Sequence, residues 1–309
     1  MTTYPTLEGE VDFRVPAAGK PCKTWYKIIG SLEEPSVPPI IALHGGPGAG
    51  HDYLASLSDI YETRKIPIIL YDQIGCGRST HLREKAGDES FWTFDLFIQE
   101  LDNLVDHLGL RSKGFHLLGQ SWGGMLAGSY AARRPLGLRR LVLSGSPASM
   151  PLYKQACKYR LAELPADIRQ TLEECDRRGD HDSPEFKEAS AVFIKRYVCR
   201  LDPLPEPIRR TFKNLKDDPT VYSTMQGHSE FATVGTLKDW EGWKDAQKIQ
   251  VETLLLNGKY DEVMDFVVEP WFRTINRVKW VTLENSSHTL LWEDRERFMQ
   301  LCGDFLSRE

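Results

Sequence analysis

Short apolar runs alternate with longer amphipathic segments along the chain. The runs most typical of strands are residues 22–29, 38–45, 66–72, 115–119, 138–145, 251–258 and 278–284. Several are almost continuously apolar, which is typical of parallel strands that are covered on both faces. Between them, "TFDLFIQELDNLVDHLGL" repeats apolar residues at intervals of three and four, and "WGGMLAGSYAARRP" ends at a proline. Both segments predict helices, and the alternating order predicts an α/β fold with a mostly parallel sheet flanked by helices.

The pattern changes between Ser146 and about Gln250. Strand-like runs disappear there, charged helical segments such as "SPEFKEASAVFIKRYVCRL" replace them, and prolines crowd "LDPLPEPIRR". We therefore predict that residues 1–145 and 251–309 form the sheet domain and that 146–250 form an inserted helical cap. Because open α/β sheets place ligands at the carboxyl ends of their strands, we expect the cap over that edge. An ordinary helical excursion is the alternative.

Composition narrows the classes of function. The 309 residues include 39 basic and 44 acidic residues, with a net charge of −5, and no long basic block, so nucleic acid is not an expected partner. The first twenty residues lack a secretory signal pattern, and no apolar run is long enough to cross a bilayer. The six cysteines are scattered, without a C-x-x-C pair. We expect a cytoplasmic protein with reduced thiols and no metal, other cofactor or membrane partner.

Ser121 stands between two glycines in "HLLGQSWGGML", directly after a predicted strand and before a predicted helix. This context is typical of a nucleophile elbow, in which the serine hydroxyl is exposed above the sheet. Gly119 and Gly123 lack a Cβ atom, so they permit the sharp turn. A glycine-rich helix start that is capped by Ser121 is the alternative interpretation.

A serine nucleophile needs a base, and the base needs a carboxylate that fixes its tautomer. After such an elbow the acid comes first along the chain and the histidine follows. His288 comes directly after the last predicted strand, whereas His181 and His228 lie in the predicted insert, so His288 is the candidate base. Asp261 follows the strand at 251–258 and is the candidate acid, with Asp265 as the fallback.

The glycine-rich loop at 43–53, "LHGGPGAGHDY", follows another predicted strand. Its backbone N–H groups, together with the amide of Trp122, are candidates for an oxyanion hole. A phosphate-binding loop is the competing interpretation, but the chain has neither of the usual glycine-rich phosphate motifs there.

With these pieces in order, the chain resembles the α/β-hydrolase fold and, within it, the proline iminopeptidase family of serine aminopeptidases. The branch that it resembles most is the tricorn-interacting aminopeptidase. The resemblance rests on "HGGPGAGHDYL", "LYDQIGCGRS", "GQSWGGMLAGSYA", "VYSTMQGHSEFATVGTLKDW", "GKYDEV" and "SSHTLLWEDRE". It implies Ser121 as nucleophile, His288 as base, Asp261 as orienting acid, and the amides of Gly46 and Trp122 as oxyanion donors.

The same resemblance implies that two acidic residues hold the free α-amino group of the substrate. The matching positions are Glu230 in "GHSEF" and Glu262 in "YDEV". An ammonium that enters a covered pocket needs carboxylates to offset its lost hydration. The alternative is that both are solvated surface glutamates. One position departs from the family pattern G-P-x-E-F, because His228 replaces the proline.

Two functions share this site. The first is an aminopeptidase that releases an N-terminal residue, often proline or another apolar residue, from short peptides. The second is an esterase, amidase or acyl-transferring cyclase for a small metabolite, because a fold does not determine a substrate. The two glutamates favour the first function, and His228 leaves room for the second. A noncatalytic protein is disfavoured, because all the candidate catalytic residues are present.

Overall fold

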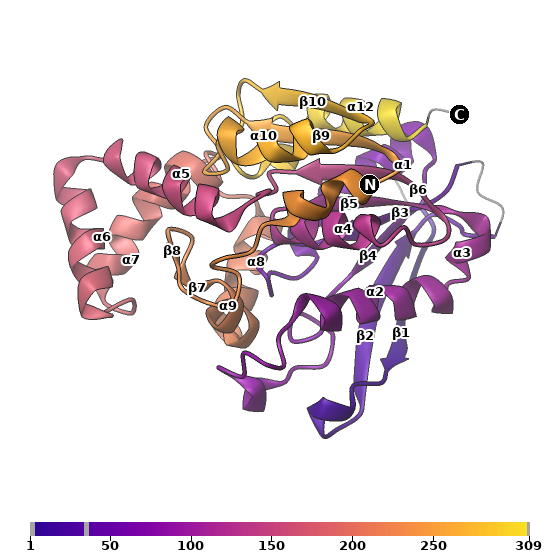
Figure 1. Ribbon diagram of the computed structural model, residues 1–309, viewed down its shortest axis with the longest axis horizontal. Coiled ribbons are helices and arrows are strands. Elements are labelled where there is room, and N and C mark those ends of the chain that lie inside the picture. Colours follow the sequence, from indigo (N-terminus) through magenta and orange to yellow (C-terminus); the bar gives the residue numbers. More distant parts are fainter. Residues whose placement is uncertain (1–3, 34–36, 308–309) are drawn as a thin grey trace.

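Eight strands form one sheet in the part of the chain that the computed structural model describes, residues 4–33 and 37–307 (Figure 1). The strands are β1 (Thr6–Phe13), β2 (Cys22–Ile29), β3 (Ile40–Leu43), β4 (Ile68–Tyr71), β5 (Phe115–Gln120), β6 (Leu138–Ser144), β9 (Glu252–Gly258) and β10 (Val278–Leu283). Their order across the sheet is β1-β2-β4-β3-β5-β6-β9-β10. Strand β2 runs antiparallel to both of its neighbours, β1 and β4, and all the other neighbouring pairs in the sheet are parallel. The predicted α/β fold with a mostly parallel sheet is confirmed.

The hydrophobic pattern does not predict the edge strand β1. It pairs with β2 along its whole length, from Thr6 opposite Ile29 to Phe13 opposite Cys22. Most of its residues are exposed, and only Val11 and Phe13 are buried. An edge strand with little covered surface has few apolar residues, so it leaves a weak signal in the sequence.

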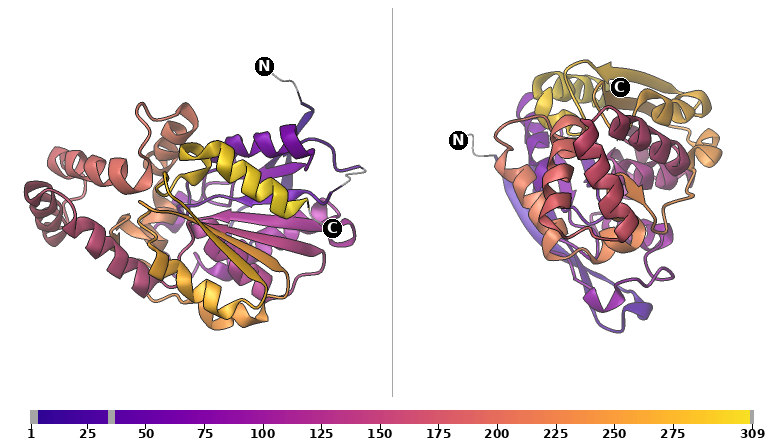
Figure 2. Two further views of the ribbon diagram at one scale, coloured as in Figure 1. Left: turned by 90° about the horizontal axis from the view of Figure 1, so that it is seen from above. Right: turned by 90° about the vertical axis from the view of Figure 1, so that its left-hand side faces the viewer.

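Helices cover both faces of the sheet. Ile41 and Leu43 pack on the face of α2, α4 and α10, whereas Ile40 and Ala42 pack on the face of α1 and α12. This two-sided burial explains why the central strands are continuously apolar. In the left view of Figure 2, the yellow helix α12 lies across its face of the sheet. The helices of this part are η1 (Pro16–Ala18), η2 (Asp52–Leu57), α1 (Ser58–Arg64), η3 (Arg83–Lys85), α2 (Phe94–His107), α3 (Leu110–Lys113), α4 (Trp122–Ala132), α10 (Asp265–Thr274), α11 (Leu290–Glu293) and α12 (Arg295–Leu306).

The segment between β6 and β9 is mainly helical, and helices α5 to α8 gather on one side of the molecule, beyond the end of the sheet (Figures 1 and 2). Its elements are α5 (Met150–Ala162), α6 (Ala166–Arg178), α7 (Pro184–Phe193), η4 (Ile194–Val198), α8 (Glu206–Asp217), α9 (Thr220–Met225), β7 (Gly227–Ser229), β8 (Ala232–Thr233) and η5 (Gly242–Lys248). The expectation that strands disappear here is wrong for β7 and β8. These two strands pair with each other but are too short to produce a periodic pattern.

All six cysteines are buried and none forms a disulfide. Across the described residues, every helix is too short or too polar to cross a membrane. Within the same part of the chain, no group of three or more His, Cys, Asp or Glu side chains is arranged to hold a metal ion.

Candidate active site

Ser121 lies on the sharp turn between β5 and α4. Its backbone angles are φ 56° and ψ −125°, a sparsely populated region that costs a non-glycine residue about 1–3 kcal/mol. The surrounding hydrogen bonds hold this conformation: the Ser121 N–H donates to the Ser144 carbonyl (2.9 Å), and the amides of Gly124 and Met125 donate to the Ser121 carbonyl. The turn therefore presents Ser121 at the carboxyl edge of the parallel strands.

The glycines on either side of Ser121 are required by space. A Cβ atom on Gly119 would lie 2.2 Å from the carbonyl oxygen of Gly123, and one on Gly123 would lie 2.1 Å from the carbonyl oxygen of Leu43. Real Cβ atoms do not approach backbone oxygens so closely. Strand β5, helix α4 and the end of β3 can therefore meet at this turn only if both positions are glycine.

His288 and Asp261 lie together at the same edge of the sheet. The Nδ1 atom of His288 is 2.8 Å from Oδ1 of Asp261, and the Asp261 side chain is fully buried. The amide of Val263 also donates to Asp261 Oδ1 (2.8 Å). The His288 backbone is fixed by Gln120, whose side-chain amide donates to the His288 carbonyl (3.1 Å). The histidine that follows β10 is thus paired with the aspartate that follows β9.

The alternative acid and histidines are placed elsewhere. Asp265 accepts a hydrogen bond from the side-chain amide of Asn257 (2.6 Å) at the start of α10. His181 and His228 stack on each other within the helical segment, with ring centroids 4.5 Å apart. Of the candidates, Asp261 and His288 are therefore the pair that the fold brings into contact.

One cavity joins the elbow, the histidine and the glycine-rich loop. Ser121, His288, Gly45, Gly46 and Glu230 all contribute to its lining. The loop lies tightly against the elbow, because a Cβ atom on Gly45 would be 3.0 Å from the Cβ atom of Ser121.

Trp122 directly follows Ser121, and its side chain is buried. It is the first residue of α4, and a first-turn N–H has no partner within its own helix. Its N–H group is therefore available beside Ser121.

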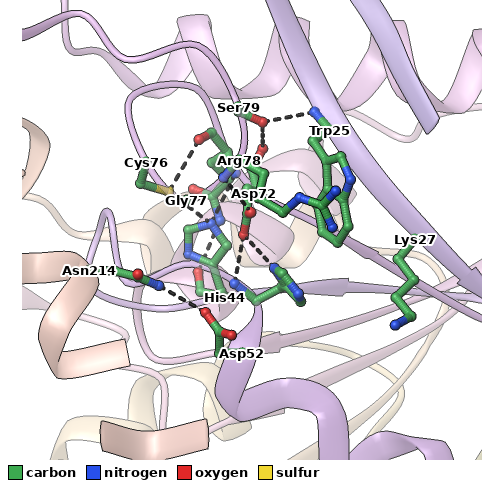
Figure 3. Close-up of polar contacts among 12 residues, drawn as sticks. Trp25, Lys27, His44, Asp52, Asp72, Cys76, Gly77, Arg78, Ser79 and Asn214 are labelled. Carbon is green, nitrogen blue, oxygen red and sulfur yellow. Dashed lines mark hydrogen bonds and ion pairs between the residues drawn. The ribbon is translucent and has the colours of Figure 1, made fainter. Parts of the chain in front are cut away.

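A buried aspartate supports the glycine-rich loop from behind (Figure 3). Asp72 Oδ1 accepts hydrogen bonds from the backbone (2.7 Å) and the ring (2.8 Å) of His51, and Oδ2 accepts one from the amide of Arg78 (2.8 Å). Burial alone raises the pKa of the Asp72 carboxyl, but these hydrogen bonds and the nearby imidazoles outweigh it and lower the pKa. Asp72 thus joins two loops that come from different strands.

Gln73 links the glycine-rich loop to the start of α4. Its side-chain amide donates to the His44 carbonyl (3.0 Å), and its side-chain oxygen accepts from the Trp122 indole (2.8 Å). Its backbone N–H donates to Nε2 of His44 (3.0 Å). The sequence analysis used "LYDQIGCGRS" only as evidence of the family resemblance. In the structure, Gln73 of this segment connects the loop at His44 with Trp122 at the start of α4, next to Ser121.

Glu230 and Glu262 lie beside His288. Glu230 accepts hydrogen bonds from the hydroxyls of Tyr222 (2.9 Å) and Tyr153 (3.3 Å). Glu262 is 1% exposed, and its Oε1 lies 3.9 Å from Nε2 of His288. Its Oε2 is buried and has no hydrogen-bond partner among the described residues. The interpretation of Glu262 as a solvated surface residue is therefore wrong.

The carboxylates dominate the electrostatics around His288. Burial on its own lowers the pKa of His288, but Asp261, by charge and hydrogen bond, together with Glu262 and Glu230, raises it to about 9. Burial raises the pKa of Glu230, and burial together with the charge of Glu230 raises the pKa of Glu262 well above its usual value. Burial, together with the repulsion that Glu262 experiences from Glu230, therefore disfavours ionisation of both glutamates at once.

The sequence did not indicate which residues donate hydrogen bonds to Glu230 and to the Asp261 carbonyl. Tyr153 and Tyr222 come from helices α5 and α9, and only the fold shows that both reach Glu230. Arg160, also on α5, donates two hydrogen bonds to the Asp261 carbonyl (3.1 and 2.8 Å). Tyr222 lies eight residues before Glu230 in the segment "VYSTMQGHSEF", and this proximity is the one signal in the sequence that could have linked the two residues. No feature of the sequence links Arg160 to Asp261.

Comparisons with known proteins agree with this geometry. The alpha/beta hydrolase fold family matches residues 38–295. A proline iminopeptidase of Saccharolobus solfataricus is 35% identical, over 92% of this chain and 87% of that protein. The solved structure of VinJ is 42% identical with a TM-score of 0.92 and covers 97% of this chain and 98% of that one. The structure of a Mycobacterium smegmatis proline iminopeptidase is 36% identical, with a TM-score of 0.85, over 92% and 94% of the two chains.

Proposed function

The chain belongs to the proline iminopeptidase family of α/β hydrolases, and on that premise we propose that it is a serine aminopeptidase. It releases the N-terminal residue of short peptides or aminoacyl amides through an acyl-enzyme. The observation that carries this proposal is the presence of two glutamates, the buried Glu262 and the half-buried Glu230, beside the His288 and Asp261 pair.

In the proposed reaction, Ser121 Oγ attacks the scissile carbonyl while His288 Nε2 accepts the hydroxyl proton. Asp261 holds the other ring nitrogen and so fixes the tautomer. The amides of Gly46 and Trp122 stabilise the developing oxyanion, where one such donor contributes roughly 3 kcal/mol. His288 then protonates the leaving amine, the C–N bond breaks, and water releases the acyl group by the reverse path.

Glu230 and Glu262 are proposed to hold the α-ammonium of the substrate. Two neighbouring carboxylates with raised pKa values are poorly stabilised on their own, and a cation between them offsets this cost. The unpartnered Oε2 of Glu262 is an acceptor for such a group. An esterase, amidase or acyl-transferring cyclase with the same triad is the alternative, but an uncharged substrate would do nothing for these carboxylates.

We also propose that residues 146–250 act as a cap, since Glu230 of this segment lines the cavity of Ser121 and His288. A cytoplasmic location is supported by the six buried, unpaired thiols, which suit a reducing compartment. The proposed partner is a small peptide or aminoacyl substrate.

Neutralising either glutamate tests the proposed function. Glu230→Gln and Glu262→Gln are each expected to lower kcat/KM for prolyl amide by about ten- to a hundredfold, because each removes a charge-assisted hydrogen bond. At pH 9, an amine-free ester of similar size should react at close to the parental rate. The measurement is kcat/KM for both substrates in the parent and the two variants.

Two results would count against this assignment. Equal losses on amide and ester would mean that the glutamates support the structure rather than hold the amine. No loss on either substrate, with a parent that prefers the ester, would favour the metabolite esterase or cyclase. An N-acetylated prolyl amide is a further control, because it keeps the scissile bond and replaces the cation with a neutral acetylated nitrogen.

The pH dependence of ester hydrolysis provides a separate prediction. Since the pKa of His288 is raised to about 9, the free enzyme carries a protonated imidazole at pH 7, which cannot accept the Ser121 proton. For an amine-free ester, kcat/KM should therefore rise about tenfold per pH unit below pH 9 and level off above it. Glu262→Gln removes a negative charge beside the ring, so its plateau should begin at a lower pH. A parental plateau that already begins below pH 7 would contradict this electrostatic account.

A further inference from the structure

A second cavity of about 500 Å³ lies between α7, α8 and the β7–β8 hairpin. It shares four lining residues with the cavity of Ser121 and His288: Val198, Phe212, Leu215 and Glu230. The two spaces therefore adjoin over a common wall. The volume lies in the range of pockets for drug-sized ligands and exceeds the needs of one amino-acid side chain.

The second cavity has aromatic and aliphatic walls, with Glu230 where it meets the first cavity and charged residues on its exposed side. Phe231 packs against Phe193 and Phe186, with ring centroids 5.2 and 6.0 Å apart, so these aromatic walls are fixed by one another. Lys187 and Lys216 also line the cavity, and both are exposed. The cavity thus runs from the catalytic region toward solvent between apolar walls.

The proposed amine site extends from the buried Glu262 to Glu230, which lies in the wall that the two cavities share. Glu262 is buried, and Tyr153 and Cys157, which contact Glu230 through its side chain and backbone, are buried as well. A substrate whose ammonium reaches Glu262 therefore enters with its amine first. Phe212 and Leu215 line both cavities, so the second cavity adjoins the space around Ser121 and His288.

We propose that the second cavity binds the leaving-group side of the substrate, and that preferred substrates carry a large apolar group on the nitrogen of the scissile amide. This inference rests on the proposed aminopeptidase function. In the reaction, the amide C–N bond breaks, His288 delivers its proton to the departing nitrogen, and the apolar amine leaves through the cavity, while water supplies the hydroxyl of the released amino acid.

A homologous series of prolyl N-alkyl amides, from methyl to octyl, tests the proposal. Full burial of a CH₂ group improves binding by about three- to fourfold, so kcat/KM should rise by up to that factor per carbon until the cavity is filled. The unsubstituted prolyl amide is the reference substrate. A flat or falling series, from an enzyme that cleaves prolyl amide, would overturn the proposal and leave the aminopeptidase assignment intact. If the enzyme cleaves no free-amine amide, both fail.

Two matched variants on α7 test whether the dependence of kcat/KM on alkyl length arises in the second cavity. Ser190 lines the second cavity, and its hydroxyl has no hydrogen-bond partner within the described part of the chain, so Ser190→Phe fills space without breaking a bond. Ala191 is exposed and lies instead beside two outer grooves, so Ala191→Phe adds the same bulk elsewhere. Ser190→Phe should abolish the dependence on alkyl length and spare prolyl amide, whereas Ala191→Phe should preserve both.

Two results with these variants would overturn the placement. If Ala191→Phe removes the alkyl dependence and Ser190→Phe does not, the leaving group lies in an outer groove. If Ser190→Phe instead alters selectivity among alanyl, leucyl and phenylalanyl amides, the second cavity holds the N-terminal side chain. Melting temperatures show whether either variant is destabilised. A rate on prolyl amide at the parental level shows independently that the variant is folded.

Discussion

Ser121→Ala is expected to reduce kcat for prolyl amide by about 10⁴- to 10⁶-fold, the range in which removal of a serine nucleophile falls. The change deletes the attacking oxygen and leaves the backbone of the elbow unchanged, because alanine adopts the same strained φ of 56° at a similar cost. The melting temperature should therefore stay close to the parental value. The measurements are steady-state kcat and thermal unfolding of the purified variant.

Ser146→Ala is the matched control for this result. Ser146 is buried beside α4, and its hydroxyl has no hydrogen-bond partner within residues 4–33 and 37–307. Its removal should leave turnover near the parental rate. Unaltered hydrolysis by Ser121→Ala, or an equal loss in Ser146→Ala, would show that the elbow serine is not the nucleophile.

Asp261→Asn is expected to lower kcat by about 10⁴-fold, because an amide in place of the carboxylate favours the wrong tautomer of the catalytic histidine. Asp265→Asn is the matched control. Asp265 bonds to Asn257 rather than to His288, so its substitution should affect stability by about 1 kcal/mol and activity little. Kinetics and urea unfolding of both variants separate the two effects.

Asp261→Asn should add little to the effect of Ser121→Ala when the two substitutions are combined. Members of a triad act as a unit, so Ser121→Ala combined with Asp261→Asn should be no slower than Ser121→Ala alone, and the same holds for His288→Ala. A nearly silent Asp261→Asn together with a severe Asp265→Asn would mean that the acid is misassigned.

The sequence predicted the sheet well because burial leaves a direct pattern. The central strands are covered on both faces and are almost continuously apolar. Strand β1 has one poorly covered face, so the hydrophobic pattern did not predict it. The candidate site could be predicted for a related reason. Ser121, Asp261 and His288 each lie within five residues of the end of a strand, and parallel strands end at one edge of the sheet.

The surroundings of the candidate site were not predictable in the same way. Tyr153 and Arg160 sit on a helix of the inserted segment, and their contacts with Glu230 and Asp261 depend on how that helix docks. Docking is a property of tertiary packing, which local periodicity does not encode. The role of Gln73 was hidden likewise, since its three bonds join segments about 30 and 50 residues away in the chain.

The position of the inserted segment has an evolutionary consequence. Strands β6 and β9, between which it is inserted, are parallel neighbours in register from Arg140 opposite Glu252 to Ser144 opposite Leu256. Descendants can therefore lengthen, shorten or exchange this segment while they inherit the sheet unchanged. The proposed amine site is split across that junction, with Glu230 in the inserted segment and Glu262 in the sheet domain. A lineage that replaces the insert would lose Glu230, one of the two carboxylates of the proposed amine site, in a single event. To keep the Asp261 and His288 pair in place, the new segment would have to replace the contacts that Arg160 and Tyr197 make with it.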